Sequence, residues 1–119
     1  MSLHIDKPLV VSSQDRYWLR FVDVYVNQQT DKEVATGIDL DSYQTIEIMF
    51  AFDTGSGYGS WTTKAMTKHA DQATYAGYAY YDWATDDLSA GDMKIRGKLT
   101  ESGGDVHYSD LIYEEVEAL

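Results

Sequence analysis

The chain has 119 residues, enough for one domain, and it has no cysteine, which excludes disulfides and thiolate metal sites. Its 20 Asp and Glu against nine Lys and Arg give a net charge of -11, so we expect neither nucleic acid nor an anionic membrane surface as a partner. No window approaches the ~20 apolar residues that span a bilayer, and the N-terminus lacks the basic start and long apolar run of a secretory signal, so we expect neither kind of segment.

Apolar side chains recur at every second position along much of the chain, which is the period of a strand with one buried face. We expect an N-terminal arm over residues 1–14 and one sandwich domain over 15–117. In chain order, strands are predicted at residues 17–26, 33–40, 45–52, 61–66, 74–83, 93–100 and 106–116, joined by polar or glycine-rich connections. One helical turn is expected at 85–88, closed by Gly91, and residues 114–119 are expected either to fray or to turn helical.

The alternation also assigns faces within these strands. In 45–52, the face expected to be buried carries Ile46, Ile48, Phe50 and Phe52, and the opposite face carries Thr45, Glu47, Met49 and Ala51. In 17–26, Val22, Val24 and Val26 share a face. Residues 102–105 predict a tight hairpin turn, because two adjacent glycines tolerate the positive φ of a primed turn. About seven strands, with turn signals at roughly the 8–12-residue spacing of sandwiches, predict an all-β, immunoglobulin-like antiparallel β-sandwich.

No motif in the sequence predicts catalysis, a cofactor or a metal. The histidines His4, His69 and His107 form no pair at metal-ligand spacing and are expected in solvated turns or at strand edges. Three acidic clusters lie at Asp39 with Asp41, at Asp82 with Asp86 and Asp87, and at Asp105 with Asp110. Calcium prefers carboxylate oxygens as ligands, but none of these clusters has the spacing of an EF-hand. Asp39 and Asp86 suit turn or capping positions instead. The glycine-rich residues 55–59 match neither a dinucleotide nor a phosphate loop, so we expect a hairpin loop that makes contacts. We therefore expect a non-enzymatic protein that works by binding.

The aromatic residues are the strongest functional signal. Ten Tyr and three Trp against three Phe supply rings with polar edges, which suit contact surfaces as well as half-buried sheet faces. The set in question is Tyr58, Trp61, Tyr75, Tyr78, Tyr80, Tyr81 and Trp83. These rings either pack in the core and on the sheets, or form an exposed platform for a sugar or a protein. Tyr78 and Tyr80 share a strand face with Asp82, and we expect that face to point outward.

A second candidate feature is a row of cations. Lys94, Arg96 and Lys98 hold a third of the positive charge on one strand face. The row is either a solvated face or a strip for an acidic neighbour, which includes a second copy of the chain. The interface candidates are thus Tyr58, Trp61, Tyr78, Tyr80, Lys94, Arg96 and Lys98.

Two resemblances to known families add to this interpretation. Residues 90–95 (Ala-Gly-Asp-Met-Lys-Ile) resemble the Ala-Gly-x-Tyr-x-Cys stretch that enters strand F of immunoglobulin domains, with Met93 at the tyrosine and Ile95 at the cysteine position. Residues 38–48, 77–83, 87–94 and 99–105 resemble stretches of the N-terminal immunoglobulin-like domain of phage baseplate upper proteins and related phage or prophage virion proteins. Tyr43 stands where that pattern has glycine.

The second resemblance covers about residues 15–117 and implies a role. The chain is expected to be a non-enzymatic structural protein of a virion, acting as a docking module in a tail or baseplate. Its partners would be other virion proteins or a second copy of itself, and it would be located in the virion or, when expressed from a prophage, in the host cytoplasm. No cofactor is implied. The alternative is a carbohydrate-binding or adhesin-type module that uses the exposed Tyr and Trp side chains.

Overall fold

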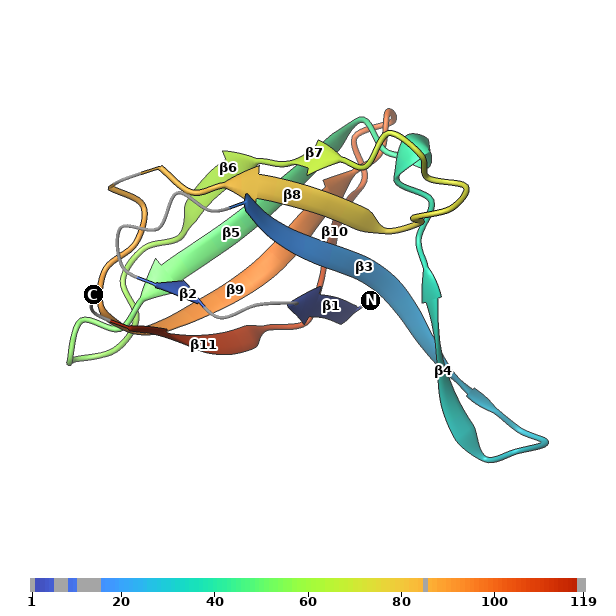
Figure 1. Cartoon of the computed structure of the whole chain (residues 1–119), viewed down its shortest axis with the longest axis horizontal. Coiled ribbons are helices and arrows are strands. Elements are labelled where there is room, and N and C mark those ends of the chain that lie inside the picture. Colours follow the sequence, from blue (N-terminus) through green and yellow to red (C-terminus); the bar gives the residue numbers. More distant parts are fainter. Residues whose placement is uncertain (1, 6–8, 11–15, 85, 118–119) are drawn as a thin grey trace.

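The computed structural model describes residues 2–5, 9–10, 16–84 and 86–117, and within them eleven strands form two sheets that pack face to face (Figure 1). Sheet A contains β1 (Ser2–Ile5), β3 (Arg16–Asn27), β4 (Lys32–Gly37), β7 (Thr67–Lys68) and β8 (Tyr78–Asp82). Sheet B contains β2 (Leu9–Val10), β5 (Thr45–Phe52), β6 (Thr62–Ala65), β9 (Gly91–Thr100), β10 (Val106–Tyr108) and β11 (Ile112–Glu117). A short 3-10 helix, η1 (Leu40–Ser42), lies between β4 and β5.

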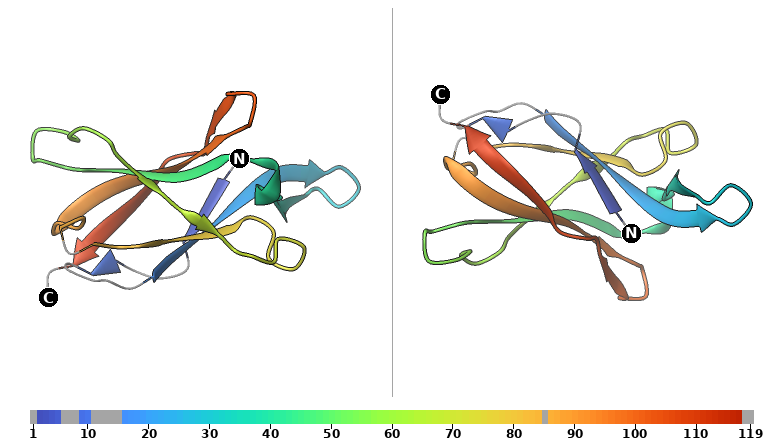
Figure 2. Two further views of the ribbon diagram at one scale, coloured as in Figure 1. Left: turned by 90° about the horizontal axis from the view of Figure 1, so that it is seen from above. Right: turned by 90° about the horizontal axis from the view of Figure 1, so that it is seen from below.

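The strand order is that of an immunoglobulin-like sandwich. Sheet A has the order β1-β3-β8-β7, with β4 also paired to β3, and sheet B has the order β2-β11-β9-β5-β6, with β10 also paired to β9. The runs β1-β3-β8-β7 and β5-β9-β11 correspond to the ABED and CFG sheets of that fold. Among the described strand pairs, only β2 with β11 is parallel. The predicted all-β sandwich is therefore confirmed, and Figure 2 shows its two layers from above and below.

The core lies between the layers and is built by alternate residues of the central strands. The fully or nearly fully buried side chains include Tyr17, Leu19, Phe21, Ile46, Ile48, Phe50, Ala79, Trp83, Met93, Ile95 and Leu99. The predicted inward face of β5 is thus confirmed, although Phe52 is only partly buried. Met49 and Ala51, on the opposite face of β5, are buried as well. They pair in register with Arg96 and Lys94, so these long side chains are their neighbours on the outer face of sheet B.

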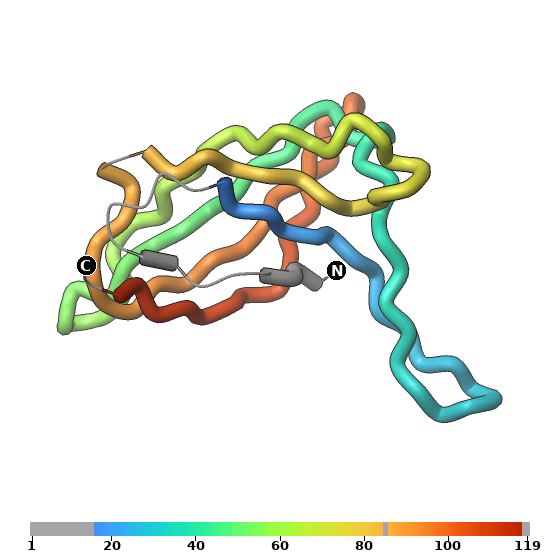
Figure 3. Tube along the Cα trace, in the orientation of Figure 1, coloured from blue at the N-terminus to red at the C-terminus, as the bar shows by residue number. Residues whose placement is uncertain are grey.

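The β3–β4 hairpin leaves the sandwich, as Figures 1 and 3 show. Val22 is buried, but Val24 and Val26, which share its face by parity, are 44% and 54% exposed. A shared face therefore does not mean a shared environment here. Val22 pairs with both Ser2 of β1 and Gly37 of β4, whereas beyond Val22, among the described strands, β3 pairs with β4 alone. At the tip, the side-chain oxygen of Asn27 accepts hydrogen bonds from the backbone N–H groups of Gln29 and Thr30.

The N-terminal and C-terminal predictions are wrong in part. Residues 2–5 pair with β3 and residues 9–10 pair with β11, so this part of the expected arm belongs to the two sheets. Residues 114–117 continue β11 and are neither frayed nor helical; residues 118–119 lie outside the described part. The predicted strand 106–116 is split in two at the buried Ser109, whose hydroxyl accepts a hydrogen bond from the N–H of Gly97.

Three predicted strand boundaries also differ. The strand predicted at 33–40 ends at Gly37, because Asp39 caps η1 by accepting a hydrogen bond from the N–H of Asp41. The strand predicted at 74–83 begins at Tyr78, because Asp71 holds the preceding residues in a turn that ends at Gly77, where φ is +87°. The polar connection expected at 67–73 contains β7, so the chain passes from sheet B to sheet A at Met66.

Two predicted turns need correction. The 102–105 hairpin turn is present, but only Gly104 has a positive φ, so it is not the primed turn that two positive-φ glycines would make. In place of a helical turn at 85–88, the N–H of Asp87 donates to the carbonyl of Ala84 in a single turn, and residue 85 lies outside the described part.

Candidate binding surfaces

Six side chains on the outer face of sheet B form a row in which aromatic rings and cations touch in sequence. In order along the row they are Tyr113, Tyr58, Lys94, Trp61, Arg96 and Tyr108, and we call this row the cation–aromatic stripe. The ammonium of Lys94 lies 4.9 Å from the ring centre of Tyr58 and 4.7 Å from that of Trp61. The guanidinium of Arg96 lies 4.7 Å from Trp61 and 4.3 Å from Tyr108. These distances are within the range of cation–π attraction.

Strand pairing and one loop assemble the stripe. The two-residue period of β9 puts Lys94 and Arg96 on one face, and Tyr113 of β11 lies directly opposite Lys94. The glycine-rich loop folds back over this face: the N–H of Thr54 donates to the carbonyl of Gly57, and Tyr58 forms a β-bridge with Asp53. The loop was predicted as a contact element, and it is this turn that carries Tyr58 and Trp61 to the row.

The stripe brings together four of the seven interface candidates: Tyr58, Trp61, Lys94 and Arg96. It also contains Tyr108 and Tyr113, which the sequence did not single out. Tyr108 is placed by the pairing of β10 with β9, and Tyr113 by the pairing of β11 with β9. The break at Ser109 hides both registers from the sequence. Lys98 lies on the same strand face, but its ammonium is 4.0 Å from a carboxylate oxygen of Glu47, so it has a partner within the chain.

The two stripe cations lack such partners. Within the described residues, no carboxylate lies within 4.0 Å of Lys94 or Arg96, and the buried Nε of Arg96 donates to no acceptor. Desolvation raises the pKa of Tyr58, helped by Asp53 and Asp92, so its hydroxyl stays neutral. The stripe is thus a cationic surface on an acidic molecule, ready to receive negative groups.

Tyr78 and Tyr80 lie on the opposite side of the molecule, on the outer face of sheet A. They point outward as predicted, since Ala79 between them is fully buried while both rings are partly exposed. The Arg16 guanidinium lies 3.7 Å from the ring centre of Tyr80 and also forms an ion pair of 2.9 Å with Asp82. The hydrogen bond from Arg16 lowers the pKa of Asp82. The predicted candidates are therefore divided between two faces.

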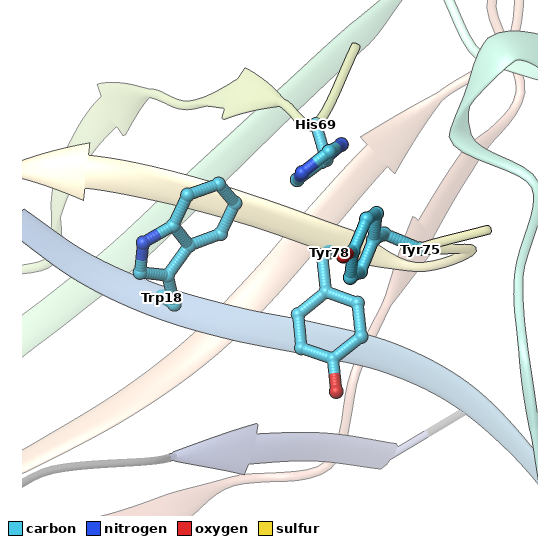
Figure 4. A pocket seen from close by; sticks show the side chains of 4 residues that line it. All are labelled: Trp18, His69, Tyr75 and Tyr78. Atoms are coloured by element: carbon cyan, nitrogen blue, oxygen red, sulfur yellow. The ribbon is translucent and has the colours of Figure 1, made fainter. Parts of the chain in front are cut away.

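Sheet A also carries a hollow of about 360 Å³, lined by Trp18, His69, Tyr75 and Tyr78 (Figure 4). The ring centres are 5.6 Å apart for Trp18 and His69, 4.2 Å for His69 and Tyr75, 6.1 Å for Tyr75 and Tyr78, and 6.5 Å for Tyr78 and Trp18. The four contacts close into a ring around the hollow. Its volume is in the lower part of the range of small-molecule sites.

A buried glutamine holds the segment that carries this hollow. The side-chain oxygen of Gln72 accepts hydrogen bonds from the N–H groups of Leu40 and Gly77, and its amide nitrogen donates to the carbonyls of His69 and Tyr78. Gln72 is only 4% exposed, and these four bonds use its full hydrogen-bonding capacity. The hollow is therefore preformed.

His69 was expected in a solvated turn or at a strand edge; it directly follows the edge strand β7 and is also part of this aromatic cluster. Its Nδ1 accepts a hydrogen bond of 3.0 Å from the N–H of Asp71, so the neutral ring carries its proton on Nε2. Trp18 and Gln72 were not singled out in the sequence. The alternation of 17–21 could have placed Trp18 outward, opposite the buried Tyr17 and Leu19. Nothing in the sequence marks Gln72.

Members of two of the three acidic clusters make bonds that hold the fold. Asp87 accepts hydrogen bonds from the hydroxyl of Tyr81 and the N–H of Ala84, while Asp41 is 2.6 Å from the ammonium of Lys68. Burial and the bond to Asp87 raise the pKa of Tyr81.

In the described part of the chain, no three His, Asp or Glu side chains gather as a metal site would need. No described helix is long and apolar enough to span a bilayer.

Comparison with protein-family models, with characterised proteins and with solved structures finds no match to this chain.

Proposed function

We propose that this chain is a non-enzymatic docking module of a phage or prophage virion that acts in a tail or baseplate through protein–protein contacts. The observation that carries the proposal is the cation–aromatic stripe. Tyr, Trp and Arg are the side chains that dominate binding energy at protein interfaces, and here they lie together on an outer sheet face. The resemblance of residues 38–48, 77–83, 87–94 and 99–105 to baseplate domains supports the virion setting.

The chemistry of the stripe favours an acidic protein surface as its partner. Lys94 and Arg96 are held on aromatic rings without carboxylates beside them, so an incoming acid would find cations that are already positioned. The net charge of -11 disfavours nucleic acid and anionic membranes as partners. Binding to another virion protein, or to a second copy of this acidic chain, fits both the unpaired cations of the stripe and the negative net charge.

The test is direct binding of the purified chain to purified tail and baseplate proteins encoded by neighbouring genes, measured by biolayer interferometry. We expect Trp61→Ala and Arg96→Glu each to weaken binding at least tenfold. Lys64→Glu is the matched control, because Lys64 is an exposed cation of β6 in the same sheet and outside the stripe. Absence of binding to every such protein, or equal binding by all three variants, would count against the proposal.

Carbohydrate binding is the second candidate, and the hollow on sheet A favours it. Its rings offer flat faces with polar edges, and Gln72 holds the backbone of the segment that carries three of them. The rings of Tyr58 and Trp61 suit a sugar less well, because Lys94 lies against both. A glycan array tests this candidate: binding that Trp18→Ala and Tyr78→Ala remove and Trp61→Ala leaves unchanged would establish it. A protein that binds glycans and no virion protein would have this function instead of docking.

A further inference from the structure

The projecting β3–β4 hairpin exposes apolar side chains that have nothing to pack against. Val24, Tyr25 and Val26 are consecutive, and each is 44–54% exposed. Beyond Val22 and Gly37 the hairpin consists of two strands alone, an arrangement that is marginally stable in water. Three adjacent exposed apolar residues on such a hairpin are typical of a contact surface.

The register of the hairpin separates its two faces. Val24 lies opposite Ala35 and Val26 lies opposite Glu33, so these four side chains share one face, which we call the valine face. Tyr25 lies opposite Val34 on the other face. The valine face is therefore apolar with one carboxylate near the tip and no cation.

The cation–aromatic stripe has complementary properties. It offers the Trp61 ring between two cations, Lys94 and Arg96, that have no carboxylate beside them in the described structure. The spacing along the strand is also the same, roughly 7 Å between Val24 and Val26 and between Lys94 and Arg96, because each pair is two residues apart at ~3.3 Å per residue. In Figure 1 the hairpin points away from the sandwich, so neither sheet covers its far half.

We propose that the valine face of one copy docks on the cation–aromatic stripe of a second copy, with Val24 and Val26 on Trp61 and the Glu33 carboxylate beside Lys94 and Arg96. This inference rests on the proposed docking function and names its partner. The two surfaces differ, so the contact is head-to-tail, and each docked copy presents a free stripe or a free hairpin to the next. Such contacts build closed rings or open filaments, depending on the rotation between copies.

Sedimentation velocity of the full chain over a concentration series tests the proposal. We expect wild type to form assemblies larger than dimers, and raised salt to weaken them. The hairpin variant Val24→Ser/Val26→Ser and the stripe variant Arg96→Glu should each stay monomeric at the same concentration. Tyr25→Ser is the matched control, because it removes an equally exposed apolar group from the other face and should assemble as wild type. Circular dichroism verifies that each variant is folded.

Mixing provides the decisive measurement. The hairpin variant keeps an intact stripe and the stripe variant keeps an intact hairpin, so an equimolar mixture should form 1:1 dimers and nothing larger. Combining Glu33→Lys with Arg96→Glu in one chain exchanges the two charges and should restore assembly.

Three results would overturn the inference: wild type monomeric at every concentration, a hairpin or stripe variant that assembles as wild type does, or a mixture of these two variants that stays monomeric. A monomeric chain that still binds tail proteins through Trp61 would overturn self-docking and leave the proposed function standing. A chain that assembles as described but binds no tail protein would support self-docking and count against the proposed role in a tail or baseplate.

Discussion

Phe21 of β3 and Gly97 of β9 meet across the sandwich so closely that a Cβ built on Gly97 would lie 2.1 Å from Cε1 of Phe21. The Phe21 ring is fully buried, and it fills the space that a side chain at position 97 would take. The contact joins the two sheets at their centre. The spacing of the layers at this point therefore depends on glycine.

The first prediction concerns this contact. Gly97→Ala forces the Phe21 ring or β9 to move, and we expect a loss of about 3 kcal/mol in the free energy of unfolding, as for an overpacked core. Urea denaturation followed by tryptophan fluorescence measures it. Gly103→Ala is the control, since a Cβ at position 103 meets nothing within 4 Å. Equal stability of the two variants would show that the sheets separate more easily than the packing indicates.

The second prediction concerns the break between β10 and β11. The buried hydroxyl of Ser109 accepts the Gly97 N–H at 2.7 Å and donates to the carbonyl of Asp110. Ser109→Ala leaves that N–H without its side-chain acceptor and should cost about 1–3 kcal/mol of stability. Ser102→Ala, at an exposed turn position, should cost little. Slowed exchange of the Gly97 amide proton in wild type, lost in Ser109→Ala, would confirm the cause; unchanged exchange would contradict it.

The third prediction concerns Gln72. Gln72→Ala leaves two N–H groups and two carbonyls without their partner, so we expect a loss of about 3 kcal/mol in stability. Because the hollow rests on these bonds, the near-ultraviolet circular dichroism of its rings should change as well. Gln44→Ala, at an exposed position, is the control. A variant with wild-type near-ultraviolet signal would mean that other contacts position the rings.

The fourth prediction concerns acid. Hydrogen bonds from Thr74 lower the pKa of Asp71. A carboxyl whose folded pKa is lowered adds stability above its unfolded pKa of about 3.9, and that stability is lost as the pH falls through the folded pKa. The Tm of wild type should thus exceed that of Asp71→Asn at pH 6 and approach it below about pH 4. Asp105→Asn controls for removal of one negative charge. A Tm difference that is constant from pH 2 to 7 would contradict the assignment.

The central strands could be predicted from the sequence because their environment is simple. β5 and β9 lie within one sheet and face one core, so a two-residue period reports their buried faces directly. The same period predicted that Tyr78 and Tyr80 point outward. It also predicted that Lys94 and Arg96 lie together, because the proximity of residues i and i+2 on one strand face does not depend on contacts with distant segments.

The remaining features depend on contacts between distant segments. The periodicity of 17–26 continues into the hairpin, yet Val24 and Val26 are exposed beyond the point where β1 stops pairing with β3, and the sequence does not show where that pairing ends. The hollow likewise joins Trp18 to His69, Tyr75 and Tyr78 through a turn that Gln72 holds. Such a grouping follows from strand order and turn geometry, which local patterns do not report.

Residues 62–68 form one extended segment that hydrogen-bonds first to β5 and then, past Met66, to β8. Sliding one layer over the other would break bonds at both ends of this segment. The stripe and the hollow lie on opposite layers, so their relative orientation is fixed by the backbone itself. A molecule bound in the hollow and a neighbour bound at the stripe would therefore be held on opposite sides of the domain at a constant separation.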